Sequence, residues 1–215
     1  HIPGSHNVSN SLAACAAASF CGIDISSVIK GLGAFTGVER RFEYKGTLGG
    51  ITIIDDYAHH PDEINATLSA AENCPHKKLW VVFQPHTYSR TKALFDDFVE
   101  QLKRPDLTYL AEIYAAREQN TIGISSSALA DQVEEARFIP TFGELEAALR
   151  ETAQPGDIIL TVGAGDVYKI GEHLVEEIAR RLNFTSLKYH LLADVKTAVG
   201  IDPDSLCTYC FTGEE

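Results

Sequence analysis

The sequence has no methionine and no long hydrophobic run, and each absence narrows what the chain can be. No run of about 18 apolar residues occurs, so we expect no transmembrane helix and no membrane partner. The chain starts at His1 rather than at an initiator methionine, and it carries no signal-peptide pattern. These features together predict a fragment of a longer protein.

Basic clusters and a cysteine framework are lacking as well. No Lys/Arg run stands out, and 30 acidic residues against 18 basic ones give a formal net charge of −12. We therefore expect no nucleic-acid partner and little adhesion to anionic membranes. The five cysteines are odd in number and show no disulfide spacing, which favours the reducing cytoplasm as the location of the chain.

The composition that remains is that of a soluble globular protein, with 45% hydrophobic and 22% charged residues. In the opening section we predict helices at 9–20 and 25–30, the second capped by Asp24 and ended by Gly31. This section holds no convincing strand and cannot close a core alone. It is therefore predicted to be the end of a neighbouring domain, followed by a linker at 34–39.

Strand-like and helix-like segments alternate from residue 40 onward. A Gly-containing turn within 41–58 predicts a hairpin. Further strands are predicted at 78–83, 107–113, 136–140 and 157–162, and helices at 61–72, 88–102, 126–135, 142–152 and 166–182. The alternation predicts an α/β fold, with a Rossmann-like, mainly parallel sheet that has helices on both faces.

Ligands of such folds collect beyond the carboxyl ends of the strands, and four polar segments follow strands here. The segment DDYAHHPDE at 55–63 offers acids and histidines for three alternatives: a metal site, ribose and phosphate binding, or a solvated loop whose Asp caps a helix. Its spacing fits no standard zinc pattern, and we assign no metal ligand. In QPHTYSRTK at 84–92, His86 and Arg90 stand four residues apart, so both can face one side of a helix start.

The other two segments carry weaker signals. YAARE at 114–118 places another arginine after a strand, and TVGAGDVYKIG at 161–171 resembles part of a dinucleotide fingerprint. Its third glycine is misplaced, and a tight turn that aims backbone groups at a small substrate explains it equally well. The adjacent Arg40 and Arg41 can reach a phosphate or remain a solvated pair.

Taken together, these segments resemble the Mur ligases of peptidoglycan synthesis. The matching stretches are HIPGSHNVSN, FTGVERRFE, DDYAHHPDEI, VVFQPHTYSRT, IYAARE and LTVGAGDVYKIGE, which occur in the family's order within 1–183. The PHTYSRT stretch is similar to the alanine-adding branch, the UDP-N-acetylmuramate–L-alanine ligases. The resemblance implies three divisions: 1–37 as the end of a central ATPase domain, 38–183 as the C-terminal domain, and 184–215 as an unexplained tail.

The resemblance also implies a reaction. ATP phosphorylates the carboxylate of UDP-N-acetylmuramate, and the amine of L-alanine then attacks the acyl phosphate to give a tetrahedral intermediate and an amide. ATP and Mg²⁺ are the implied cofactors, held mainly by the missing central domain, because the G-x-x-x-x-G-K-[ST] loop is absent from this chain. We therefore expect the chain to be inactive by itself.

The roles of individual residues follow from the same resemblance. His6 and Asn7 match a segment beside the adenine, Arg41 an arginine near the nucleotide phosphates, and Asp56 the aspartate that holds the ribose hydroxyls. The amino-acid and γ-phosphate side is matched by Tyr57, His59, His86 and Arg90. Arg90 is the candidate for the alanine carboxylate. The catalytic candidates are His59, His86 and Arg90.

The tail departs from the family. Its end, DPDSLCTYCFTGEE, contains Cys207 and Cys210 as C-x-x-C and resembles the C-terminus of glutamine phosphoribosylpyrophosphate amidotransferase. A stray fused segment, a redox pair and half of a zinc site remain open. Two other functions are also weighed for the whole chain. One is a stand-alone nucleotide- or dinucleotide-binding oxidoreductase domain, and the other is a non-catalytic interaction module.

Overall fold

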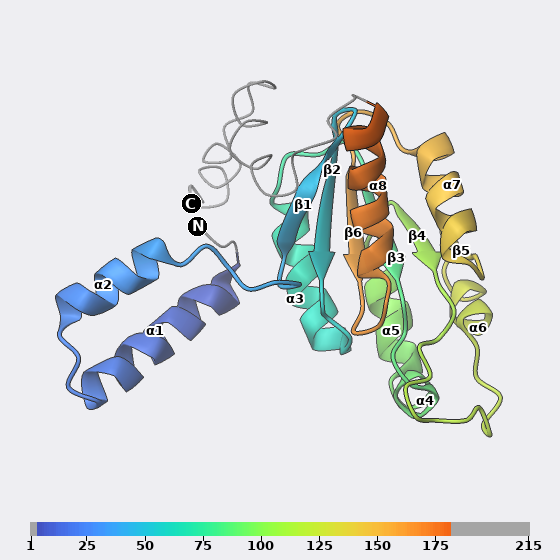
Figure 1. Ribbon diagram of the computed structural model, residues 1–215. Coiled ribbons are helices and arrows are strands. Elements are labelled where there is room, and N and C mark those ends of the chain that lie inside the picture. Colours follow the sequence, from blue (N-terminus) through green and yellow to red (C-terminus); the bar gives the residue numbers. More distant parts are fainter. Residues whose placement is uncertain (1–3, 182–215) are drawn as a thin grey trace.

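The computed structural model describes residues 4–181, and their strands form one six-stranded sheet in the order β1-β2-β6-β3-β4-β5 (Figure 1). β1 is antiparallel to β2, and every other neighbouring pair is parallel. The strands are β1 Glu43–Leu48, β2 Ile51–Asp56, β3 Leu79–Phe83, β4 Leu107–Leu110, β5 Ala136–Phe138 and β6 Ile158–Val162. The predicted hairpin and mainly parallel sheet are confirmed.

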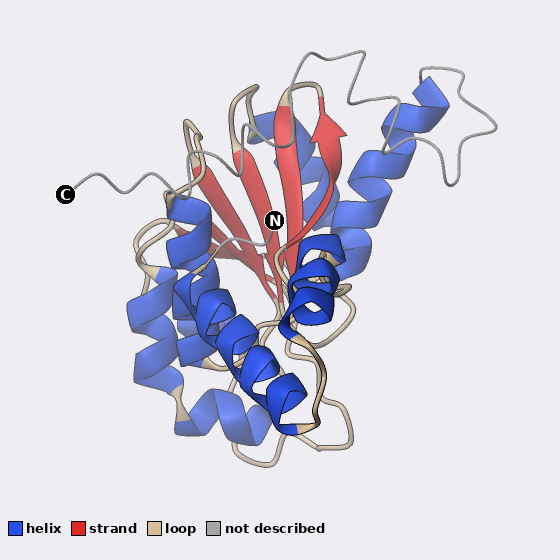
Figure 2. Cartoon of the chain, turned by 90° about the vertical axis from the view of Figure 1, so that its left-hand side faces the viewer, coloured by secondary structure: helices blue, strands red, loops and turns tan. Residues whose placement is uncertain are grey.

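Helices cover both faces of the sheet, as predicted, and each face has its own apolar core (Figure 2). One core packs Phe83 of β3 against Leu68 and Phe98; the other packs Trp80 of β3 against Leu145 and Leu174. Successive side chains of β3 therefore point alternately into one core and into the other. The helices that flank the sheet are α3 Pro61–Glu72, α4 Tyr88–Ala93, α5 Phe95–Leu102, α6 Ser126–Ala130, α7 Phe142–Thr152 and α8 Tyr168–Arg181.

Local chemistry explains why α3 begins where it does. Pro61 occupies the first turn, and His60 and Glu63 form a capping box. The His60 ring accepts from the backbone N–H of Asp62, and the Glu63 carboxylate accepts from the backbone N–H of His60. The alternative in which an Asp caps this helix is therefore wrong, because a histidine ring takes that place. Thr141 caps α7 in the ordinary way by accepting from Glu144 N.

The N-terminal helices α1 Ser5–Phe20 and α2 Ile25–Ala34 pack on each other beside the sheet domain (Figure 1). Asp24 caps α2 by accepting from Ser27 N, as predicted. The predicted bounds of both helices are wrong: α1 begins four residues earlier, and α2 continues through Gly31 and Gly33 because neither glycine adopts a positive φ. Several large apolar side chains on this pair are exposed, and they are Val8, Leu12, Phe20, Ile25 and Ile29.

Two helices of the sheet domain also differ from the prediction. The single helix expected at 88–102 is split into α4 and α5 at Leu94, whose φ of −114° and ψ of 26° are not helical and whose side chain packs against the core. The helix expected at 126–135 ends at Ala130. The N–H groups of Gln132 and Val133 donate to carbonyl oxygens three residues earlier instead of four, and Val133 packs in the core. Both changes come from packing rather than from a helix-breaking residue.

Among the described residues, none of the helices has both the length and the apolar character needed to cross a bilayer. The predicted tail at 184–215, including Cys207 and Cys210, lies outside the described residues.

Candidate functional site at the carboxyl edge of the sheet

The carboxyl ends of four neighbouring strands lie level with one another. Asp56 at the end of β2 pairs with Val162 of β6, which pairs with Phe83 of β3, which in turn pairs with Leu110 of β4. The segments that follow these residues therefore emerge at one edge of the sheet, which we call the carboxyl edge. They are the four polar segments singled out from the sequence, as expected for an open α/β sheet.

A row of rings lies along this edge. The ring of Tyr57 meets that of His59 edge-on at 5.4 Å between centroids, and the ring of His59 lies 5.8 Å from that of His86. His86 in turn stacks on Tyr114 at 5.5 Å, with 19° between the planes. Three of the four residues predicted on the amino-acid side are therefore neighbours, although they come from two different loops. Tyr114 belongs to the same row and was not predicted.

Arg90 joins this row through His86. Its Nη1 donates to Nδ1 of His86 at 3.2 Å, so the two residues do face one side, as their spacing predicts. A guanidinium can only donate, so Nδ1 of His86 accepts and the ring proton lies on Nε2. Burial, followed by the positive charge of Arg90, lowers the pKa of His86 below its usual value. His86 is therefore a neutral ring that offers an N–H at Nε2.

His59 has the opposite arrangement. Its Nδ1 lies 3.0 Å from the carbonyl oxygen of Tyr57 and 3.4 Å from the Glu63 carboxylate, and both partners can only accept. Nδ1 of His59 therefore carries a proton, which leaves Nε2 of the neutral ring as an acceptor. The adjacent histidines thus differ in tautomer. One presents a donor at Nε2 and the other an acceptor.

Glu63 holds the loop that carries His59. Its carboxylate accepts from the backbone N–H groups of His59 and His60 at 3.0 and 3.2 Å. Burial alone would raise the pKa of Glu63, but the backbone hydrogen bond from His59, then that from His60, together with the positive charge of Arg41, outweigh it, so its pKa lies below the usual value. The residue is therefore an anion that fixes both the loop and the tautomer of His59.

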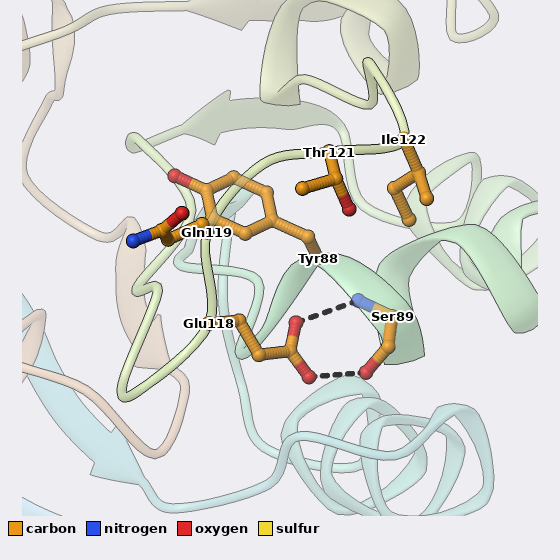
Figure 3. A pocket seen from close by; sticks show the side chains of 6 residues that line it. All are labelled: Tyr88, Ser89, Glu118, Gln119, Thr121 and Ile122. Carbon is orange, nitrogen blue, oxygen red and sulfur yellow. Dashed lines mark hydrogen bonds between the residues drawn. The ribbon is translucent and has the colours of Figure 1, made fainter.

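The start of α4 is fixed by Glu118, another residue that was not predicted. Its carboxylate accepts from the backbone N–H of Ser89 at 2.9 Å and from the Ser89 hydroxyl (Figure 3). These bonds lower the pKa of Glu118. An open pocket of about 330 Å³ lies here, lined by Tyr88, Ser89, Glu118, Gln119, Thr121 and Ile122. Arg117, the arginine noted in the sequence, is exposed.

The residues predicted to bind the nucleotide are less closely grouped. The Asp56 carboxylate is 6% exposed and accepts from the backbone N–H groups of Phe42 and Ala58 at 2.9 and 2.8 Å, and burial raises its pKa. The Arg41 side chain is half exposed, 3.9 Å from Glu63 and 5.7 Å from the Tyr57 ring. His6 and Asn7 lie in the first turn of α1, on the N-terminal helix pair.

The glycine turn after β6 is packed against protein atoms. A Cβ on Gly163 would lie 2.7 Å from the backbone oxygen of Gln84, and one on Gly165 would lie 2.8 Å from the Tyr114 ring. The Gln84 side chain accepts from Val167 N at the start of the next helix. These glycines are therefore required by close packing, which explains their spacing without a dinucleotide.

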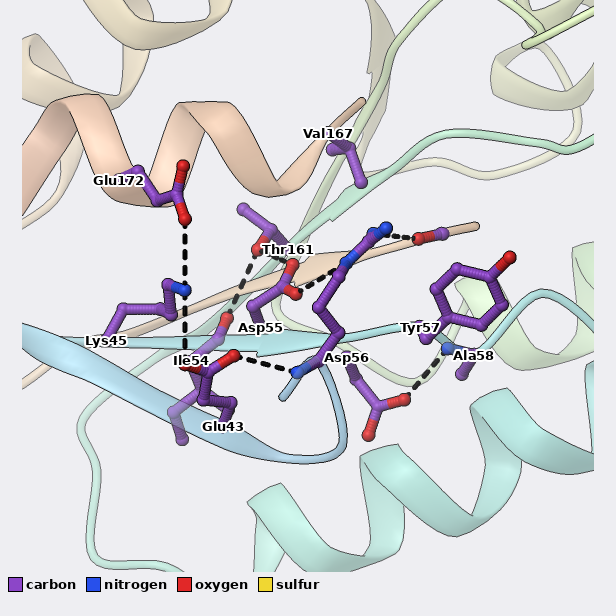
Figure 4. A network of polar contacts seen from close by, with 12 residues as sticks. Glu43, Lys45, Ile54, Asp55, Asp56, Tyr57, Ala58, Thr161, Val167 and Glu172 are labelled. Carbon is purple, nitrogen blue, oxygen red and sulfur yellow. Dashed lines mark hydrogen bonds and ion pairs between the residues drawn. The ribbon is translucent and has the colours of Figure 1, made fainter. Parts of the chain in front are cut away.

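A polar network lies beside Tyr57, with the buried Asp55 at its centre (Figure 4). The Asp55 carboxylate accepts from the Thr161 hydroxyl at 2.6 Å and from Nε of Arg40 at 3.2 Å. Burial raises the pKa of Asp55 in spite of these bonds. Lys45 joins β1 to α8 by ion pairs of 3.2 Å with Glu43 and Glu172. The network ties the hairpin, β6 and α8 together at the edge that carries the site.

Metal binding by the DDYAHHPDE segment finds no support in this geometry. Within residues 4–181, no group of three or more His, Cys, Asp or Glu side chains is arranged to hold a metal ion. The acids and histidines of the segment are instead used by one another and by the backbone, as described above for Asp56, His59 and Glu63.

The sheet order and the helices on both faces define a Rossmann-like α/β domain. Residues 40–165 match the family model described as "Mur ligase, glutamate ligase domain". The UDP-N-acetylmuramate–L-alanine ligase of Agathobacter rectalis is 53% identical over 180 residues, which cover 82% of this chain and 39% of that protein. The chain belongs to the Mur ligase family.

Solved structures agree with this assignment. The crystal structure of a UDP-N-acetylmuramate–alanine ligase from Thermotoga maritima is similar with a TM-score of 0.67 and 32% identity, over 84% of this chain and 39% of that one. MurF ligase from Thermotoga maritima, solved in complex with ADP, has a TM-score of 0.63 over 83% of this chain and 40% of that one. Its 18% identity shows the fold alone. The chain spans about 39% of the length of the curated relatives it matches.

Proposed function

We propose that this chain is the C-terminal portion of an ATP-dependent ligase that joins L-alanine to UDP-N-acetylmuramate in the cytoplasm, the step from which peptidoglycan peptides grow. The proposal rests on one observation above all, the placement of Tyr57, His59, His86 and Arg90 in contact with one another at the carboxyl edge. The similarity to alanine-adding relatives supports the choice of substrate.

The site matches the chemistry of an α-amino acid. The Arg90 guanidinium and the Nε2–H of His86 are neighbouring donors, which suits a carboxylate. Nε2 of His59 is an acceptor beside them and suits the amino group, since the rings of His59 and His86 are 5.8 Å apart. A zwitterion bound in this way has its carboxylate and its amine read by different residues.

Catalysis follows from positioning. In the proposed reaction the amine attacks an acyl phosphate, so a fixed amine close to that carbon contributes much of the rate. The His59 acceptor can take the proton that the ammonium group must lose before its nitrogen attacks, and phosphate leaves as the amide forms. The cationic Arg41 and Arg90 suit the negative charge of the tetrahedral intermediate. We place the catalytic roles on His59, His86 and Arg90 for these reasons.

For ATP we propose His6, Asn7, Arg41 and Asp56. Arg41 suits a phosphate because its side chain is half exposed. An ionised carboxylate accepts about four hydrogen bonds, and two backbone N–H groups and the Thr67 side chain occupy most of that capacity at Asp56, which leaves room for one ribose hydroxyl. His6 and Asn7 would approach from the N-terminal helix pair, within the proposed division 1–37, 38–183 and 184–215. The described residues supply no ligand set for Mg²⁺, so we derive no step through it.

The two other functions have less support. The glycine turn after β6 is filled by Gln84 and Tyr114, which removes the feature that favoured a dinucleotide-binding oxidoreductase. A non-catalytic interaction module does not need hydrogen-bond donors and acceptors in fixed positions at the carboxyl edge. His59 and His86 provide a fixed acceptor and a fixed donor there, which favours the ligase proposal.

The test is alanine-dependent ADP release by a full-length protein in which this chain replaces the matching part of the Agathobacter rectalis relative. Arg90→Ala is expected to raise the KM for alanine roughly a hundredfold. Arg137→Ala, at an exposed arginine of β5, is the matched control and is expected to change nothing. The 215-residue chain alone is expected to hydrolyse no ATP, because it has no phosphate-binding loop. Alanine-independent turnover, or an unchanged KM in Arg90→Ala, contradicts the proposal.

A further inference from the structure

Arg40 contacts three of the segments that meet at the carboxyl edge. Its Nε donates to Asp55 at 3.2 Å and its Nη2 donates to the carbonyl oxygen of Gly163 at 2.6 Å. Its guanidinium carbon lies 4.8 Å from the centroid of the Tyr57 ring and 4.5 Å from that of Tyr168. The side chain therefore joins the end of β2, the glycine turn after β6 and the first residue of α8.

The backbone of the same residue is also engaged. The Arg40 carbonyl oxygen accepts from the backbone N–H of Tyr57 at 2.6 Å, and its own N–H donates to Glu43 at 2.8 Å. Arg40 has a φ of 58° and Phe42 a φ of 45°, which is a left-handed conformation that costs free energy in residues with a side chain. The contacts of Arg40 and the bond from Phe42 N to Asp56 hold this conformation in place.

The side chains of Arg40 and Arg41, which are consecutive in this strained segment, lie in different surroundings. The Arg40 side chain is 21% exposed, and its polar contacts are with protein atoms of the domain. The Arg41 side chain is 52% exposed and lies 3.9 Å from Glu63. Both guanidinium groups lie over the Tyr57 ring, at 4.8 and 5.7 Å from its centroid. The position of Arg40 thus fixes where Tyr57 can be.

We propose that Arg40 is a positioning residue for the amino-acid end of the site, which sets the affinity for alanine by holding Tyr57 without touching the substrate. The inference rests on the proposed function. The role requires a guanidinium, because the two bonds leave different nitrogens in different directions while the flat group lies over two rings. A lysine ammonium keeps the charge but cannot make these contacts together.

The experiment compares Arg40→Met, Arg40→Lys and wild type in the full-length chimera, with ADP release measured against alanine concentration. Both variants are expected to raise the KM for alanine at least roughly tenfold with a smaller fall in kcat, since alanine binds more weakly while the reacting groups stay in place. Arg137→Met is the matched control, with wild-type KM expected. A purely structural role would instead lower the amount of folded enzyme and leave KM unchanged.

A second variant covers the case in which Arg40→Met does not fold. Tyr168→Leu removes one ring from the Arg40 guanidinium and keeps its bonds to Asp55 and Gly163, so a smaller rise in KM is expected. If the folded variants keep the wild-type KM within about twofold while the wild-type chimera is active, the role of Arg40 is overturned and the proposed function stands. If the wild-type chimera shows no alanine-dependent ADP release, both are overturned.

Discussion

The two edges of the sheet differ in which residues adopt a positive φ: among residues 4–181 the carboxyl edge has non-glycine residues as well as Gly163, and the opposite edge has glycines alone. Four non-glycine residues adopt a positive φ within residues 4–181, and all of them, Arg40, Phe42, Thr87 and Ala116, lie in segments at the carboxyl edge. At the opposite edge, where the parallel strands begin, the positive-φ positions are Gly49, Gly50 and Gly156. Glycine adopts these conformations at no steric cost, whereas other residues lose about 1–3 kcal/mol each. Strain is therefore concentrated where the site lies.

Polar side chains differ between the edges in the same sense. At the opposite edge the buried Asp157 accepts from the Trp80 indole and from Gln154 N, both at 2.9 Å, and Asp106 accepts from Leu79 N at 2.7 Å. Their partners are fixed protein groups. At the carboxyl edge His86 and Arg90 are partly exposed, and Arg90 donates a hydrogen bond to the His86 ring. Besides its buried network around Asp55, the carboxyl edge therefore carries partly exposed donors, whereas the opposite edge, which we call the stable edge, uses these polar groups for structure.

The largest effect is expected at the stable edge. Asp157→Ala leaves the Trp80 N–H and the Gln154 N–H without their acceptor, so the free energy of unfolding is expected to fall by about 2–3 kcal/mol. Urea unfolding followed by circular dichroism measures this, because Trp80 fluorescence changes with the substitution itself. The KM for alanine in the chimera should remain at its wild-type value.

Asp131→Ala is the matched control for that measurement. Asp131 is exposed and directly follows α6, so its replacement is expected to change stability by less than about 0.5 kcal/mol. Equal losses in both variants, or a KM that moves with Asp157→Ala, would break the contrast between the two edges.

A smaller effect of opposite sign is expected at Thr87. This β-branched residue has a φ of 68° and a ψ of 144°, so Thr87→Gly is expected to raise the free energy of unfolding by about 1 kcal/mol. The added freedom beside His86 should at the same time raise the KM for alanine. Thr121→Gly, in an exposed loop without a positive φ, is expected to lower stability by roughly 0.5 kcal/mol. A destabilised Thr87→Gly variant contradicts the idea of stored strain.

The smallest effect concerns the protonation of His86. Burial and then the charge of Arg90 lower its pKa, so an NMR titration should give a midpoint below the ordinary value of 6.5. The unfolded chain then binds the proton first, and stability contributed by the neutral ring is lost as pH falls below 6.5. Arg90→Met should raise the pKa part of the way, since burial remains, and Arg137→Met should leave it unchanged. A wild-type midpoint at or above 6.5 would contradict this assignment.

The sequence was sufficient for the elements whose signals are local. The hairpin follows from its glycine turn, α3 from Pro61 and the acids behind it, and β3 and β6 from their continuous apolar runs. The carboxyl edge was also predictable, because the polar segments follow parallel strands. The contact of His86 with Arg90 follows from their spacing in the chain.

The parts that failed depend on distant contacts. Nothing near Leu94 marks a helix break, and the bend there arises because its side chain packs on the core. Tyr114 and Glu118 join the site only because β4 lies beside β3. The Arg40 and Arg41 side chains have different surroundings because Arg40 and Phe42 adopt left-handed conformations, and no local sequence pattern predicts these conformations.

The order of the strands carries a consequence for synthesis of the protein. Among residues 4–181, β6 is the last strand in sequence order, yet it lies between β2 and β3 and is hydrogen-bonded to both. Until it leaves the ribosome, the hairpin and the β3–β4–β5 unit have no shared partner, and the inner edges of β2 and β3 stay open to pairing with other chains. A nascent chain released before Ile158 is therefore expected to aggregate, whereas one released after Val162 can complete the sheet.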